Sequence, residues 1–134
     1  MGAVLDTNVI IEVARNREFL DKVLELDNTF YITSITRFEL LVGLPRKEEL
    51  IWLDSLIELP FDRKSAEIAA YLYKKLKDKG KPMGLRDLFI GAVSLANELP
   101  LITMDNDFEV LREFGLIVKP LKIPENDQSI SSAG

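Results

Sequence analysis

The sequence of 134 residues contains no cysteine and no histidine. Without cysteine, the chain can form neither disulfides nor thiolate metal sites. Without histidine, it lacks the most common general base and the most common zinc ligand of enzymes. Any catalysis must therefore use carboxylates, hydroxyls, lysines or arginines, and we expect a metal ion to assist them.

Long apolar runs are also missing. No stretch approaches the roughly 18 apolar residues that a membrane helix needs, and the start MGAVLD has no basic segment of a secretory signal. We therefore expect a cytoplasmic protein that makes no membrane contact. The net charge of −5 argues against a protein that coats nucleic acid. It is compatible with an enzyme that reaches phosphates through bound cations.

Short apolar runs alternate with helical patterns along the chain, whose length fits one domain. We expect strands at Ala3–Leu5, Thr29–Thr33, Ile57–Leu59, Leu101–Thr103 and Leu116–Val118. We expect helices at Val9–Ala14, Phe19–Leu26, Ser34–Leu44, Lys47–Leu56, Leu85–Leu99 and Phe108–Phe114, and one that Asp62 caps and that runs to Lys79. This order predicts an α/β domain over residues 1–120, with a parallel sheet covered by helices on both faces. Residues 121–134 form a polar tail that we expect to be disordered.

Acids follow two of the expected strands. Asp6 follows the first strand in VLDTN, and Asp105 and Asp107 follow another in LITMDNDF. In parallel sheets the functional crevice lies outside the carboxyl ends of the strands, so these acids are expected at one edge. Each acid is also a good helix N-cap, and the sequence leaves this second interpretation open.

Two further acids interrupt apolar helices. Glu39 stands within ITRFELLVGL and is expected to border or enter the buried face, and Asp87 has the same character in GLRDLFIGAVSLA. An acid in the first turn also suits the helix dipole, so this alternative stays open for Asp87. Burial of a carboxylate is costly unless a cation or several donors meet it. Acids that can converge, without histidine or cysteine, indicate a hard divalent ion such as Mg²⁺ or Mn²⁺.

The segments VLDTNVII, ITRFELLVG, LRDLFIGAVSLA and LITMDNDF, in this order, resemble the PIN-domain nucleases and especially the VapC-type ribonuclease toxins. The resemblance covers residues 2–120 and implies a five-stranded parallel sheet of order 3-2-1-4-5. It also implies the following site: Asp6, Glu39, Asp87 and Asp105 as catalytic metal ligands, Asp107 as a further or substitute ligand, and Asn8 and Thr103 as small polar residues that orient them.

The resemblance implies a metal-dependent endoribonuclease that forms a homodimer and has a small antitoxin protein as its partner. One or two bound ions would activate a water for attack on an RNA phosphate. Arg86 is a candidate RNA contact. Lys79 and Lys81 in KDKGK either contact phosphates or form a solvated turn.

Three alternatives remain from the sequence. A receiver-like Mg²⁺-binding module would need an acid after its middle strand, where this chain reads IELP. A catalytically silent PIN-like scaffold would gain nothing from clustered like charges. A PIN-like nuclease that processes RNA, and is not a toxin, would carry the same acids.

Overall fold

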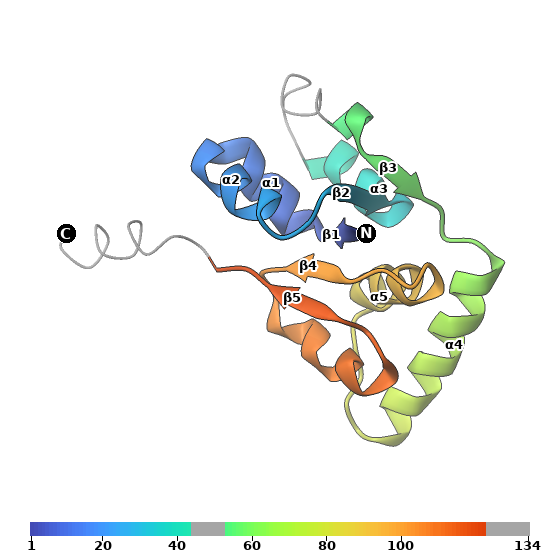
Figure 1. Cartoon of the computed structure of the whole chain (residues 1–134). Coiled ribbons are helices and arrows are strands. Elements are labelled where there is room, and N and C mark those ends of the chain that lie inside the picture. The colour runs from blue at the N-terminus through green and yellow to red at the C-terminus, as the bar shows by residue number, and fades with distance from the viewer. Residues whose placement is uncertain (44–52, 123–134) are drawn as a thin grey trace.

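The computed structural model describes residues 1–43 and 53–122 (Figure 1). A five-stranded sheet crosses the molecule, and helices pack against both of its faces. The strands are β1 (Gly2–Leu5), β2 (Thr29–Thr33), β3 (Ile57–Leu59), β4 (Leu101–Thr103) and β5 (Val118–Pro120). The helices are α1 (Thr7–Arg15), α2 (Arg17–Leu24), α3 (Ser34–Gly43), α4 (Arg63–Asp78), α5 (Leu85–Ala96) and the 3-10 helix η2 (Asn106–Phe114).

The sheet has the order β3-β2-β1-β4-β5, and all of its strand pairs are parallel. The predicted order 3-2-1-4-5 and the α/β class are therefore confirmed. A receiver domain has the order 2-1-3-4-5, so the receiver alternative is wrong. The chain builds the sheet outward from β1 to β2 and β3, and then crosses to β4 and β5 on the other side. The switch point of the sheet consequently lies between β1 and β4.

Successive side chains of β1 enter two different core layers. Val4 packs in the cluster that includes residues of α4, α5 and η2, such as Leu72, Leu88 and Phe108. Leu5 packs in the cluster that includes Phe19 and residues of α1 and α3. This alternation is the two-residue period of a strand. Because both faces are covered, all four residues of β1 are buried, and the strand reads as an apolar run.

Helix α4 begins where the sequence predicts. The Asp62 side chain accepts a hydrogen bond of 2.9 Å from the Ser65 N–H, which satisfies one of the free donors of the first helical turn. Within residues 1–43 and 53–122, no helix has the length and apolar character needed to cross a membrane.

The last strand begins two residues later than predicted, at Val118 instead of Leu116. The reason is the end of η2. Gly115 adopts φ 99°, a left-handed conformation that suits glycine, and the Leu116 N–H bonds the Leu111 carbonyl at 3.2 Å. Leu116 is therefore used to close the helix and is not free to pair with β4.

Other predicted boundaries also need correction or stay open. The helix expected at Phe108–Phe114 begins at Asn106 and is a 3-10 helix. The sequence could not show this, because over so few residues the spacing of apolar side chains does not distinguish three residues per turn from 3.6. The helix expected at Leu85–Leu99 ends at Ala96. The helix expected at Lys47–Leu56 lies largely outside the described residues, as does most of the tail 121–134.

Candidate active site

The predicted acids gather at the carboxyl edge of the sheet, beside the switch point between β1 and β4. Asp6 directly follows β1, and Asp105 follows β4, whose residue Ile102 pairs with Leu5. Glu39 comes from α3, and Asp87 comes from the first turn of α5. Three layers of the fold therefore deliver carboxylates to the crevice in which open α/β sheets bind ligands.

Asp6 is completely buried, and each of its two oxygens accepts a hydrogen bond. Its Oδ1 accepts from the Thr7 N–H at 2.8 Å, and its Oδ2 accepts from the Thr103 hydroxyl at 2.8 Å. The Asp105 N–H donates in turn to Thr103 Oγ1 at 3.0 Å, which leaves the Thr103 proton for Asp6. Burial raises the pKa of the Asp6 carboxyl above its ordinary 3.8, although these bonds and the Arg86 charge oppose the rise. Thr103 therefore fixes the orientation of Asp6.

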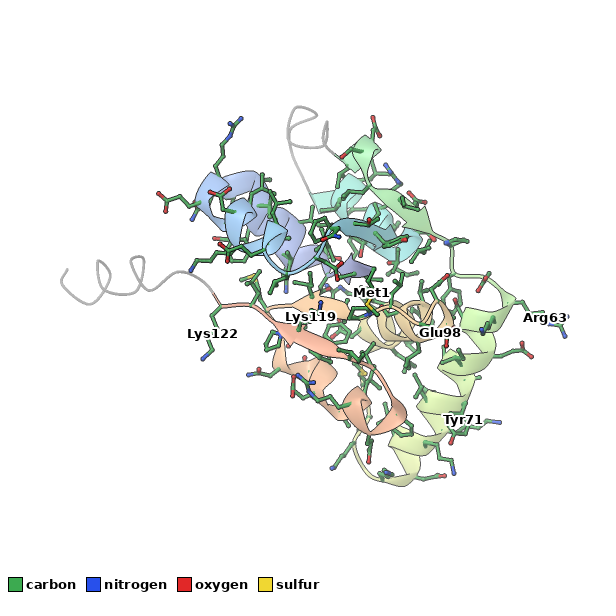
Figure 2. All side chains as sticks on the ribbon, viewed as in Figure 1. Met1, Arg63, Tyr71, Glu98, Lys119 and Lys122 are labelled. Carbon is green, nitrogen blue, oxygen red and sulfur yellow. The ribbon has the colours of Figure 1, made fainter. Side chains whose placement is uncertain are left out.

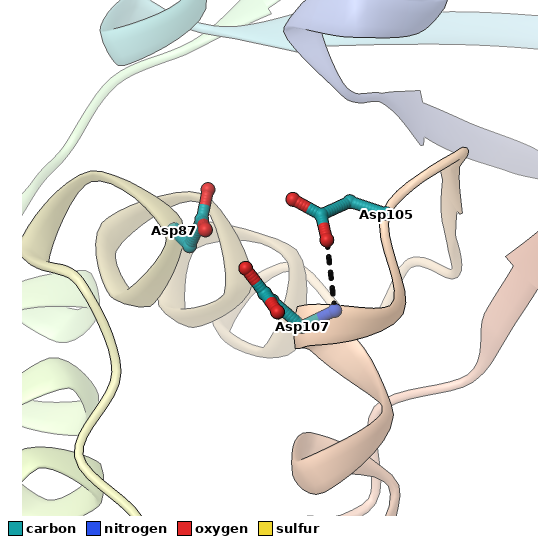
Figure 3. A group of neighbouring side chains, drawn as sticks. All are labelled: Asp87, Asp105 and Asp107. Atoms are coloured by element: carbon teal, nitrogen blue, oxygen red, sulfur yellow. Dashed lines mark hydrogen bonds between the residues drawn. The ribbon is translucent and has the colours of Figure 1, made fainter.

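Asp87, Asp105 and Asp107 form an acidic trio (Figure 3). One carboxylate oxygen of each lies within 4.8 Å of the others. The Asp107 N–H donates to Asp105 Oδ1 at 2.9 Å, so Asp105 also caps η2. The structure thus places the predicted further ligand, Asp107, directly beside two members of the predicted quartet.

The Asp87 carboxyl has a strongly raised pKa. Burial, together with the neighbouring carboxylates Asp6, Asp105 and Asp107, raises the pKa from 3.8 to about 6 against the opposing charge of Arg86. Its side chain is only 13% exposed. A carboxylate held ionised in such a place needs a cation close to it.

Arg86 supplies a cation to the other side of the site. Its guanidinium contacts Glu39 through Nε and Asp87 through Nη1, and Nη2 lies 3.6 Å from Asp6 Oδ1. The acids therefore form two groups that share Asp87: the acidic trio, and the group of Asp6, Glu39 and Asp87 around Arg86. Arg86, the predicted RNA contact, is thus engaged with carboxylates in this structure.

Glu39 lies at the margin of the buried face of α3, with a side chain that is 22% exposed. This position agrees with the expectation that Glu39 borders the buried face, although most of its apolar neighbours are exposed. Leu40 is buried, but Phe38, Leu41 and Val42 are exposed, because they lie on the opposite side of the helix. Glu39 reaches the site through Arg86 and through a bond of 2.6 Å from the Thr7 hydroxyl.

Asn8 has a different position from Thr103, which donates a hydrogen bond to Asp6. Its side chain is exposed and lines a hollow of about 530 Å³, together with Asp105 and Asp107. Asn8 is therefore placed to meet a ligand of these acids, whereas Thr7 and Thr103 hold the acids themselves.

Comparison with known proteins identifies the family. Residues 3–113 match the PIN domain family. Ribonuclease VapC3 of Methanocaldococcus jannaschii is 46% identical over 94 residues, which cover 69% of this chain and 98% of that protein. Ribonuclease VapC5 of Mycobacterium tuberculosis is 36% identical over 120 residues, which cover 82% of this chain and 87% of that protein. The chain belongs to the PIN domain family, in its VapC-type group.

A solved structure agrees with this assignment. It is VapBC-5 from Mycobacterium tuberculosis, described as a member of the VapBC family of toxin-antitoxin systems. It superposes with a TM-score of 0.66 at 29% identity, over 91% of this chain and 98% of the compared chain.

The donor atoms of this PIN domain fit a hard divalent cation. Mg²⁺ binds oxygen ligands at about 2.1 Å, so adjacent ligands lie about 3 Å apart. The oxygens of the acidic trio lie within 4.8 Å of one another, so small side-chain movements would bring them to a common ion. Carboxylates and water are the ligands that Mg²⁺ and Mn²⁺ prefer.

Sequence reasoning missed Thr7, which holds Glu39 in this PIN domain. The Thr7 side chain is buried, and its hydroxyl lies 2.6 Å from Glu39 Oε1 and 3.1 Å from Thr36 Oγ1. A hydroxyl has one proton, so if Thr7 donates to Glu39, Thr36 must donate to Thr7. The available signal was a hydroxyl residue directly after Asp6 and another three positions before Glu39. Nothing in the sequence shows that they meet.

Proposed function

We propose that this VapC-type PIN domain is a metal-dependent endoribonuclease and the toxin of a toxin-antitoxin pair. The observation that carries the proposal is the convergence of Asp87, Asp105 and Asp107 within 4.8 Å at the crevice of the sheet. The two similar proteins that are named ribonucleases support RNA as the substrate. The similarity to VapBC-5 supports the toxin role.

The residues of the site divide the work of such a reaction. When bound, Mg²⁺ or Mn²⁺ supplies an activated water and stabilises negative charge on the phosphate. The acidic trio would hold the ion, while Thr103 keeps Asp6 in place and Thr7 keeps Glu39 in place. No side chain is needed as a nucleophile. Ser34 bonds the Leu59 carbonyl and the Phe61 N–H, which is a structural role.

Two hollows beside the acids suggest the path of the RNA. One, of about 530 Å³, is lined by Asn8 and Arg15, and the other, of about 360 Å³, is lined by Lys81. Both hollows are also lined by Asn106 and Asp107, so they lie on either side of one member of the acidic trio. We place a single RNA strand across both, with one phosphate near Arg15 and another near Lys81. Unstacked strands can follow such a path, whereas a stiff duplex cannot.

The neighbouring Lys79 is less available for RNA. Its Nζ lies 2.9 Å from Glu113 and 5.4 Å from the centre of the Phe114 ring. Within the KDKGK stretch, Lys81 is therefore the better candidate for a phosphate contact.

RNA cleavage by the purified chain tests the enzymatic part of the proposal. Single-stranded and hairpin RNA are incubated with Mg²⁺, with Mn²⁺ or with EDTA, and the products are separated on a gel. We expect cleavage of unpaired segments with either ion and none in EDTA. Asp87→Asn should remove cleavage, because it removes one charge that holds the ion. Cleavage that continues undiminished in EDTA would refute the mechanism.

An antitoxin would have to block the acidic crevice. Arg86 already contacts Asp6, Glu39 and Asp87, whereas Asp105 and Asp107 form no ion pair with another described residue, so an arginine or lysine of a partner protein is suited to these two acids. We expect a small antitoxin protein to be encoded next to this chain and to suppress RNA cleavage when the two are co-purified. Unchanged cleavage by the complex would contradict the toxin role but would leave the nuclease activity standing.

We also propose a homodimer that forms through α3. Phe38, Leu41 and Val42 are exposed, and their spacing of three and four residues places them on one face of the helix. Sedimentation velocity should give the mass of a dimer for the parent and of a monomer for Leu41→Lys. A parent that sediments as a monomer at high concentration would exclude the dimer.

A further inference from the structure

Arg86 is bound by three acids from three different elements. Each nitrogen of its guanidinium faces another partner: Nε faces Glu39 on α3, Nη1 faces Asp87 on α5, and Nη2 faces Asp6 after β1. A planar guanidinium presents its donors in a fixed fork and can therefore bridge several carboxylates, as a point charge on lysine cannot. The guanidinium therefore binds three carboxylates that could otherwise bind a metal ion.

The other half of the site has no such cation. Within the described ranges 1–43 and 53–122, neither Asp105 nor Asp107 forms an ion pair with a lysine or arginine. Their carboxylates nevertheless lie beside Asp87, which carries one contact from Arg86. Asp87 therefore belongs to both groups of acids. Arg86 neutralises part of the charge of Asp6, Glu39 and Asp87, whereas the acidic trio can bind a cation from solution.

We propose that Arg86 takes the place of a second divalent ion, so that this chain binds one such ion, at Asp87, Asp105 and Asp107. The inference rests on the proposed metal dependence and makes it more specific. A two-ion site would need a second ion near Asp6 and Glu39. In this chain those oxygens already face a fixed positive charge.

Electrostatic repulsion by Arg86 determines which of the two groups of acids binds a divalent ion first. A divalent ion among Asp6, Glu39 and Asp87 would lie at contact distance from the guanidinium, and like charges at that distance repel strongly in a half-buried site. It could bind only after Arg86 had left, with the loss of three ionic contacts. Of the acids in the trio, only Asp87 contacts Arg86, so an ion there does not require Arg86 to leave the site. The first ion therefore binds at the trio, and Arg86 opposes a second.

Arg86 can be replaced without removing a side chain that caps helix α5. Its side chain is 35% exposed, and it stands in the first turn of α5, whose N-cap residue Gly84 provides no side-chain cap. Loss of its charge should therefore leave the helix intact and expose Asp6, Glu39 and Asp87 to a second cation.

Equilibrium dialysis of the full chain against Mn²⁺, with the bound metal counted by atomic absorption, tests this inference. We expect one tightly bound ion per parent chain and two per chain for Arg86→Gln. Arg86→Lys keeps the positive charge and should stay at one. Two ions on the parent would overturn the inference, as would two on Arg86→Lys or a single ion on a folded Arg86→Gln chain.

Arg37→Gln is the matched control. Arg37 has a similar exposure of 33% and pairs with Glu58, away from the acids, so its loss should leave one ion per chain. Two ions on this control would show that the count responds to net charge and not to the place of Arg86, which also refutes the inference. RNA cleavage separates the two proposals. A parent that binds two ions and loses cleavage in EDTA refutes only the role of Arg86, whereas a parent that binds none refutes the metal dependence itself.

Discussion

Replacement of Asp87 by asparagine should stabilise the metal-free protein at neutral pH and have little effect in acid. Asp87 has a raised pKa of about 6 in the folded chain, against 3.8 for an ordinary carboxyl. Between these values the folded state binds more protons at this position than the unfolded state does. The stability of the parent therefore falls as the pH rises from about 4 to about 6. Asparagine does not titrate, so the variant escapes this loss.

The size of the effect follows from the two pKa values. Their difference corresponds to about 3 kcal/mol of unfavourable free energy for the ionised folded state. The side chain is only 13% exposed, so solvent screening reduces this value little. At pH 4 the variant and the parent should be about equally stable. At pH 7 the variant should be more stable by roughly 2–3 kcal/mol, or on the order of 10 °C in melting temperature for a domain of this size.

Urea unfolding in EDTA at several pH values between 4 and 7.5 measures the difference directly. A difference between Asp87→Asn and parent that stays constant over this range would refute the reasoning. Asp62→Asn provides a control of opposite sign. The Ser65 N–H lowers the pKa of Asp62, so its contribution is present at neutral pH and is lost in acid. With saturating Mn²⁺ the order at pH 7 should reverse, because only the parent keeps the full set of ligands.

Three further changes test other parts of the site. Asp6→Asn should abolish RNA cleavage, whereas Asp62→Asn should keep it, and equal losses in a gel assay would indicate unfolding instead of chemistry. Thr7→Val should lower the free energy of unfolding by about 1–2 kcal/mol in urea, because it removes the bond to Glu39 and leaves a buried Thr36 hydroxyl with one partner fewer. Lys81→Gln should weaken binding of single-stranded RNA in fluorescence anisotropy and reduce the slope of log affinity against log salt by about 0.7; an unchanged slope would exclude a phosphate contact at this position.

Most of the sheet could be predicted from the sequence alone. The predicted strands Thr29–Thr33, Ile57–Leu59 and Leu101–Thr103 coincide with β2, β3 and β4. The first and last are rich in apolar and β-branched residues, and Pro60 marks the end of the short strand IEL. The last strand could not be placed in the same way. Its run LIV is apolar throughout, and only the bond from Leu116 back to Leu111 decides where pairing begins. That bond depends on how η2 ends, which a period-two pattern does not report.

The acids of the candidate site could be predicted from the sequence, but the arginine that contacts them could not. Asp6 and Asp105 follow from their places at strand ends, and Glu39 follows from its interruption of an apolar helix, although that helix exposes much of its apolar surface. Arg86 could not be assigned to these acids. It precedes Asp87 directly, and adjacent helical positions do not usually face each other. Its contact with Glu39 spans 47 residues and requires α3 to pack beside α5.

A position as helix cap does not prevent Asp6 and Asp105 from facing the crevice of the sheet. A carboxylate has two oxygens with about four acceptor sites, so a cap uses only part of its capacity. Asp6 bonds the first turn of α1 through Oδ1 and still accepts from Thr103 through Oδ2, and Asp105 caps η2 while it faces Asp87. Asp62 also caps a helix after a strand. It follows β3, however, at the outer edge of the sheet, where no neighbouring strand delivers a second acid. Position relative to the switch point, and not capping, therefore separates the acids of the site from those that only begin a helix.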